Sequence, residues 1–182
     1  MNIYLSSYGI DPKHNKNTNC YAEIVAILKN KKVAIIPNAR LVSQNRDTAY
    51  RVQKELSKNS INSDIIDIDA KPLNINKYDA LYFTGGEPKY LMNSIYKNNL
   101  FHKIEKFIHS HGIVIGQSAG AMIFNKQYLD TTTSKLEILN NGFNYNNKII
   151  VPHFDTLPEE LLKQLPKNIL KINDTDRLVK ID

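Results

Sequence analysis

Short apolar runs alternate with amphipathic stretches along the whole chain, and this pattern predicts its elements. VAIIP (33–37), ALYFT (80–84) and IVIG (113–116) are apolar at consecutive positions rather than at every second one. Such runs are typical of strands covered on both faces, as in a parallel sheet flanked by helices. The expected strands span residues 2–6, 32–37, 64–68, 80–84, 112–116 and 148–152. The expected helices span residues 18–28, 45–58, 88–96, 101–109 and 158–164, with a short one after Ser118.

The alternation of strands and helices predicts an α/β fold, with a mostly parallel sheet flanked by helices on both faces. We expect a single domain over residues 1–182, because the chain is long enough for one core. Ligands bind outside the carboxyl ends of such strands. Four expected strands end in chemically suggestive residues, and we expect these tips to converge on one edge of the sheet: 37–40, 84–87, 116–118 and 151–153. Residues 129–147 are polar and are expected to form an irregular, mobile loop.

Composition and charge favour an ordinary globular protein of the cytoplasm. The net charge is +6, but the basic residues are spread along the chain, which favours a solvated surface over a nucleic-acid interface. No apolar run approaches the roughly 20 residues of a membrane span, and the first residues lack a signal-peptide pattern. The single cysteine, Cys20, fits a reducing compartment. No metal-ligand spacing or nucleotide-binding glycine motif occurs, so we expect neither a metal nor a cofactor.

Ser118 is the first candidate for chemistry, because it lies between two glycines directly after an apolar strand. The segment GQSAG (116–120) matches the Gly-x-Ser-x-Gly nucleophile elbow, in which glycines allow a tight turn that exposes the serine. A helix would follow, and the backbone N–H of Ala119 would then be a donor to an oxyanion. Alternatively, Ser118 binds a phosphate or only caps that helix. Its place after a strand in an α/β chain favours the nucleophile.

A second glycine pair, Gly85 and Gly86, follows the strand before. Glycines at a strand tip can leave backbone N–H groups open to an anion, although a tight turn would use them too. Four of the chain's seven glycines lie in these two motifs, which argues against their use in turns alone.

His153 is the candidate general base, because among the five histidines it alone follows an expected strand. His102, His109 and His111 lie on or just after a polar helical stretch and are expected at the surface, and His14 lies in a polar loop. A carboxylate must orient the imidazole. The residues alone leave its identity open among five: Asp130, Glu137, Asp155, Asp174 and Asp176.

Three segments together resemble peptidase family S51, which contains the aspartyl dipeptidase, dipeptidase E, and cyanophycinase. They are GGEPKYLM (85–92), GQSAGAM (116–122) and VPHFD (151–155), in this order and spacing. The resemblance covers nearly the whole chain, and it implies a fold close to class I glutamine amidotransferases with serine in place of cysteine.

The resemblance also implies a role for each matching residue. Ser118 would be the nucleophile, His153 the general base, and Gly86 and Ala119 the oxyanion hole. Asp174, in the segment INDTDRL (172–178), would be the acidic member, and the family pattern also makes Asp130 a candidate. Glu87 and Pro88 depart from the pattern. If Glu87 points inward, its charge would disfavour an acidic substrate side chain. The chain is also short after His153, so the acidic group is expected to be at risk of displacement or loss.

We therefore expect a serine peptidase that hydrolyses a short peptide, as a dipeptidase does, through an acyl-enzyme on Ser118. Two alternatives stay open. One is an S51-like binding or regulatory protein whose shortened C-terminus lost the acid. The other is an esterase or amidase with the same Ser118–His153 pair. The expected partner is a small peptide substrate, without nucleic acid or membrane, and a homodimer stays open.

Overall fold

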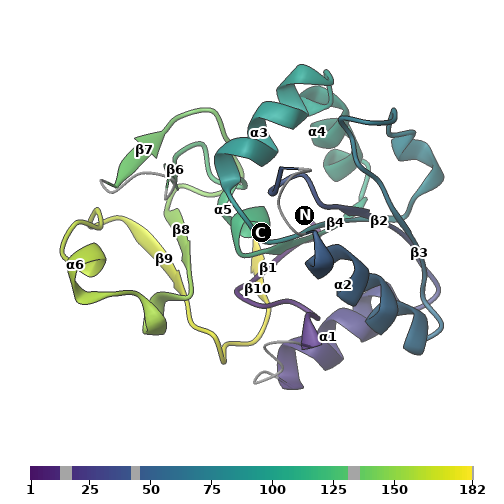
Figure 1. Ribbon diagram of the computed structural model, residues 1–182, viewed down its shortest axis with the longest axis horizontal. Helices are drawn as coiled ribbons and strands as arrows, with labels where there is room; N and C mark the ends of the chain where they lie inside the picture. The colour runs from purple at the N-terminus through teal and green to yellow at the C-terminus, as the bar shows by residue number, and fades with distance from the viewer. Residues whose placement is uncertain (13–17, 42–45, 131–135, 182) are drawn as a thin grey trace.

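The computed structural model describes residues 1–12, 18–41, 46–130 and 136–181, and a mostly parallel sheet forms its centre (Figure 1). The strand order is β10-β1-β5-β4-β2-β3, and all neighbours are parallel except β10, which runs antiparallel to β1. The strands of this sheet are β1 (Ile3–Ser6), β2 (Lys32–Ile36), β3 (Asn62–Ile65), β4 (Ala80–Phe83), β5 (Ile113–Gln117) and β10 (Val179–Ile181).

Helices cover both faces of this sheet, as the consecutive apolar runs predict. They are α1 (Thr18–Leu28), α2 (Asp47–Lys58), α3 (Pro88–Lys97), α4 (Phe101–His109) and α5 (Ala119–Met122). A further short helix, α6 (Glu159–Leu162), lies away from this sheet, on the left of Figure 1, and two 3₁₀ turns are η2 (Ile75–Lys77) and η3 (Phe154–Thr156). Alternate residues of one strand enter different cores. Ile35 packs in the cluster that holds α1 and α2, whereas Ile36 packs in the cluster that holds α3, α4 and α5. The predicted α/β fold is confirmed.

Two small sheets lie beside the main one, on the left of Figure 1. Strands β6 (Tyr128–Asp130) and β7 (Glu137–Leu139) pair antiparallel, and strands β8 (Ile149–Pro152) and β9 (Ile169–Ile172) pair parallel. The expectation that all four suggestive tips lie on one sheet is therefore wrong for β8. An apolar run shows that a strand is buried, but it does not show which sheet the strand joins.

Three other expectations need correction. The strand expected over 64–68 is β3, which pairs with β2 over 62–65; the buried Ile66 and Ile68 follow it. The polar segment 129–147 is not wholly irregular, because it holds β7 and the end of β6, and its residues 131–135 lie outside the described part. Strands β9 and β10 were not expected, since neither is a continuous buried run.

In the described part of the chain, no helix combines the length and the apolar character that crossing a membrane would require.

Candidate active site

Ser118 lies in a sharp turn between β5 and α5. Its backbone is in a conformation that L-residues rarely adopt, with φ 50° and ψ −114°. The Ser118 N–H donates to the Ser6 carbonyl at 2.9 Å, which continues the pairing of β5 with β1 into the turn. Such a strained residue is held only when its surroundings determine it. The half-buried Ser118 side chain is thus presented at the tip of a central strand.

The glycines around Ser118 are sterically required. A Cβ on Gly116 would lie 2.5 Å from the Gly120 carbonyl oxygen, and a Cβ on Gly120 would lie 2.3 Å from that of Phe83. Both contacts are with backbone, so no side chain can rotate away to relieve them. The prediction that these glycines permit a tight turn is confirmed.

Gly86 lies in the neighbouring turn, between β4 and α3. Its φ of +147° is unfavourable for any other residue, and a Cβ would lie 2.3 Å from the Ala39 carbonyl oxygen. That same oxygen accepts a hydrogen bond from the Glu87 N–H at 2.7 Å, which ties the turns after β2 and β4 together. Gly86 and Ser118 line one cavity. Ala119 begins α5, directly after Ser118.

Ser118, His153 and Asp174 form a hydrogen-bonded row. The Nε2 atom of His153 lies 3.1 Å from the Ser118 Oγ, and its Nδ1 lies 2.6 Å from an oxygen of Asp174. His153 follows β8 in a left-handed backbone conformation, and Asp174 is a buried residue just after β9. An ionised carboxylate can only accept, so the proton belongs on Nδ1 and the Nε2 lone pair faces the serine hydroxyl. The segment after His153 is therefore long enough to supply a carboxylate.

Two neighbours hold the Asp174 carboxylate and its backbone. Thr156 donates its hydroxyl to the second carboxylate oxygen at 3.3 Å, and the Asp174 N–H donates to Asp155 at 2.9 Å. The ring of Tyr8 lies 4.6 Å from that of His153. Burial, together with the negative charge of Asp174, raises the pKa of Tyr8, so the phenol keeps its proton.

Ser7 connects the main sheet to the small β8–β9 sheet. Its buried hydroxyl accepts from the His153 N–H at 2.9 Å and lies 3.0 Å from the Ile172 carbonyl oxygen, to which it can donate. One side chain thus sets the segment of His153 against that of Asp174. Sequence reasoning missed Ser7 and Tyr8, although the polar pair directly after the first expected strand stands at a strand tip like the others.

The other candidate residues lie elsewhere. Asp130 is fully buried and forms an ion pair with Lys89 at 2.9 Å, Glu137 is exposed on β7, and Asp176 accepts from the Asn173 N–H at 2.6 Å. Three histidines are exposed, as expected: His102, His109 and His111. His14 lies outside the described residues. Burial raises the pKa of Cys20 to about 12, so this thiol is no rival nucleophile.

An apolar cavity of about 130 Å³ adjoins the row. Its lining combines Ser118, His153 and Gly86 with aliphatic side chains from several segments and with Pro152: Met122, Leu129, Leu136, Val151, Leu157, Leu161 and Leu165. Glu87 is not among the described residues that line it. Ser118 and His153 therefore border an apolar cavity.

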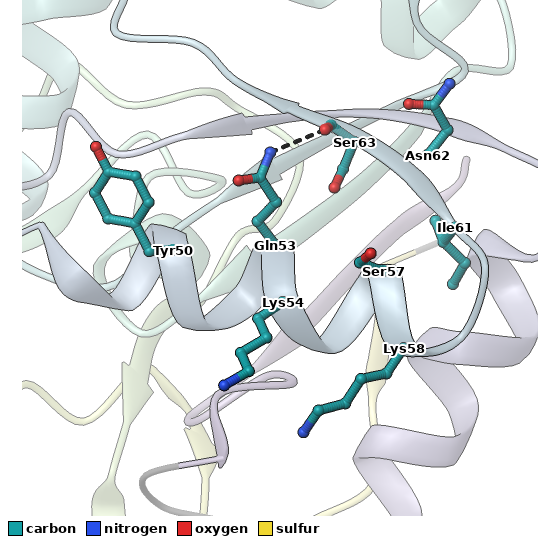
Figure 2. Close-up of a pocket in the computed structure, with 8 residues that line it drawn as sticks. All are labelled: Tyr50, Gln53, Lys54, Ser57, Lys58, Ile61, Asn62 and Ser63. Carbon is teal, nitrogen blue, oxygen red and sulfur yellow. Dashed lines mark hydrogen bonds between the residues drawn. The ribbon is translucent and has the colours of Figure 1, made fainter.

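A larger hollow, of about 540 Å³, lies between α2 and β3. Figure 2 shows it lined mainly by polar side chains, with Gln53 donating to the Ser63 carbonyl at 3.0 Å and the amino groups of Lys54 and Lys58 on the opposite side of the helix from that bond. None of the strand-tip residues discussed above lines this hollow. Among the described residues, no group of three or more His, Cys, Asp or Glu side chains could hold a metal ion.

Comparison with known proteins gives a family match over almost the whole chain. The model of peptidase family S51 matches residues 3–182. The uncharacterized peptidase Lmo0363 of Listeria monocytogenes serovar 1/2a is 24% identical over 155 residues, which are 79% of this chain and 76% of that protein.

Two crystal structures share the fold. One, described as a "Putative Peptidase E Protein" from Listeria monocytogenes EGD-e, has a TM-score of 0.71 at 22% identity and covers 95% of this chain and 90% of its own. The other, a peptidase from an acI-B1 actinobacterium, has a TM-score of 0.71 at 18% identity and covers 97% and 83%.

Proposed function

Because this chain belongs to peptidase family S51 and is a serine-type peptidase, we propose that it hydrolyses a short peptide, as a dipeptidase does, through an acyl-enzyme on Ser118. The observation that carries the proposal is the row from Asp174 through His153 to Ser118, with separations of 2.6 and 3.1 Å. These are hydrogen-bond distances between an acid, a base and a nucleophile in the order that acyl transfer requires.

In the first half of the reaction, the Ser118 Oγ attacks the peptide carbonyl carbon while its proton passes to His153 Nε2. Asp174 stabilises the imidazolium that forms. The C–N bond then breaks, His153 returns the proton to the leaving amine, and the acyl group stays on Ser118. In the second half, His153 takes a proton from water, which attacks the ester carbonyl carbon. The bond from that carbon to Ser118 Oγ then breaks, His153 returns the proton to this oxygen, and the acid is released.

The N–H groups of Gly86 and Ala119 are proposed to hold the oxyanion. Within the described residues, neither group donates to another protein atom. The N–H of Ser118 is already bonded to Ser6, so it is not available. Two preset donors at the point where negative charge develops are a large part of catalysis in acyl transfer. We place this reaction in the cytoplasm, a proposal supported by the use of only one cysteine.

Replacement of the nucleophile tests the proposal. Ser118→Ala should lower kcat/KM for every dipeptide that the parent cleaves by at least about 10⁴-fold, because no acyl-enzyme can form. Hydrolysis followed by amine release measures it, and an unchanged thermal midpoint shows that the variant is folded. Full retention of dipeptide hydrolysis by Ser118→Ala would contradict the proposal.

A further inference from the structure

The cavity beside Ser118 has the size of one substrate side chain. Its volume is about 130 Å³. An apolar protein cavity of roughly 150 Å³ is known to admit benzene, so this one fits a side chain such as that of leucine, methionine or phenylalanine. Because the acyl residue becomes bonded to Ser118, which lines the cavity, its side chain stays within reach of the recess throughout the reaction.

One wall of the cavity is a stripe of leucines. Leu157, Leu161 and Leu165 follow one another at intervals of four, and α6 spans the middle of this segment. Leu161 lies on α6, whereas Leu157 precedes the helix in extended backbone and Leu165 follows it, and all three line the cavity. All three are only half-buried in the free protein, unlike Met122 and Leu129, which line the cavity and are buried. A bound apolar side chain would remove further leucine surface from water, which is favourable.

Among the described residues that line the cavity, no Lys or Arg offers a partner for a negative charge, and none is Asp or Glu. His153 is in the lining, but its two ring nitrogens face Asp174 and Ser118. The nearby cation Lys89 is not in the lining, and its ammonium is engaged with Asp130 at 2.9 Å. A carboxylate placed in such a recess would lose its hydration without gaining an ion pair or enough hydrogen bonds, and this is strongly unfavourable.

Resting on the proposed function, we infer that the cavity selects the residue whose carbonyl is attacked, and that this residue is Leu, Met or Phe rather than Asp. The selectivity arises from the lining of the cavity, in particular from Leu161, rather than from repulsion by Glu87. The enzyme is thus a peptidase for short apolar peptides.

The test compares aminoacyl p-nitroanilides, in which only the acyl residue varies while the leaving group is constant. The kcat/KM for the Leu compound should exceed that for the Asp compound by at least about 100-fold. It should exceed that for the Ala compound by about 10-fold or more, because the methyl group leaves most of the cavity unfilled.

Two neighbouring variants sharpen the test. Leu161→Arg should lower the Leu-to-Asp ratio by at least about 10-fold, because it places a cation in the lining. Leu162→Arg is the matched control, since Leu162 is also half-buried, is adjacent and is not in the described lining. Its ratio should stay within about twofold of the parent's. Leu161→Ala, a milder change, should lower turnover of the Leu compound about fivefold and leave the Ala compound unchanged.

Hydrolysis of p-nitrophenyl acetate distinguishes failure of the cavity assignment from failure of the proposed function. It needs the catalytic residues around Ser118, but acetate has no side chain that could enter the cavity. With acetate hydrolysis intact, equal turnover of the Leu and Asp compounds, or equal effects of Leu161→Arg and Leu162→Arg, would overturn the cavity assignment and leave the proposed function standing. Absence of both acetate hydrolysis and anilide hydrolysis in the parent would overturn the proposed function, and the cavity assignment with it.

Discussion

Ser118 stands at the tip of a central strand of the main sheet, whereas His153 and Asp174 follow the two strands of the small β8–β9 sheet. The first region is held by backbone. Its glycines have no space for a Cβ, and the Ser118 N–H bonds directly to β1. The second region is held by side chains, chiefly Ser7 and Thr156. The nucleophile is therefore fixed by the fold itself, and the base is fixed by a few replaceable hydrogen bonds.

Damage to the two regions should therefore appear in different measurements. A change in the turn around Ser118 or Gly86 meets backbone atoms and cannot relax without moving a strand tip. A change around His153 removes one hydrogen bond and leaves both sheets able to form. Misplacement of a catalytic group by about 1 Å can cost about 10²-fold in rate without loss of the fold.

The largest effect is expected at the end of the row. Asp174→Asn should lower kcat by about 10⁴-fold, because an amide that donates to His153 Nδ1 stabilises the wrong tautomer and cannot stabilise the imidazolium. Steady-state kinetics on the best dipeptide measures it. Asp130→Asn is the comparison, since that residue pairs with Lys89 instead. A greater loss of activity in Asp130→Asn than in Asp174→Asn, at equal stability, would show that Asp174 is not the acidic member of the row.

The next largest effect is expected in the turn between β4 and α3, which contains Gly86. Gly86→Val should lower kcat by about 10²–10³-fold, because its Cβ cannot lie 2.3 Å from the Ala39 oxygen and the turn must shift. Gly85→Ala should cost less, since its φ is ordinary and its Cβ would come no nearer than 3.2 Å to the Ser118 Cβ. Kinetics and circular dichroism together check it. If a folded Gly86→Val variant kept the parental kcat, the assignment of the Gly86 N–H to the oxyanion hole would be wrong.

A smaller effect is expected where the two sheets meet. Ser7→Ala should lower kcat by up to about 10²-fold with little change in KM, because the His153 N–H loses its acceptor and the ring can drift. Ser94→Ala is a matched control: it also removes a buried hydroxyl, one that donates to Asp69 at 2.7 Å, and should reduce stability without this loss of kcat. Recovery of kcat in Ser7→Thr would support positioning, and equal kcat in Ser7→Ala and Ser94→Ala would refute it.

The sequence predicts the region around Ser118 better than the region around His153 and Asp174, because local patterns determine the first and contacts between distant segments determine the second. Apolar runs and paired glycines are local signals, so the strands before Gly85 and Gly116 and the turns after them can be read directly. Which sheet β8 joins depends on pairing with β9, whose residues are largely half-exposed and carry no continuous apolar run. Such pairing is decided by packing between distant segments, which no local pattern records.

The same limit applies to the candidate site. Ser118 and His153 stand out because each directly follows an apolar strand. Asp174 was one carboxylate among several, and only resemblance to a family singled it out. Ser7 acts on residues far away in the chain, and a serine after a strand gives no sign of such partners. The leucine stripe over 157–165 is visible in sequence, but that it faces Ser118 follows only from the fold.

If His153 and Asp174 activate Ser118, this serine should react readily with a fluorophosphonate. Mass spectrometry of the digested protein should find one phosphonyl adduct, on the peptide that contains Ser118. The adduct should be absent in Ser118→Ala, and it should form at least about 100-fold more slowly in His153→Ala. An adduct on another residue, or equal labelling rates in the parent and in His153→Ala, would contradict the account.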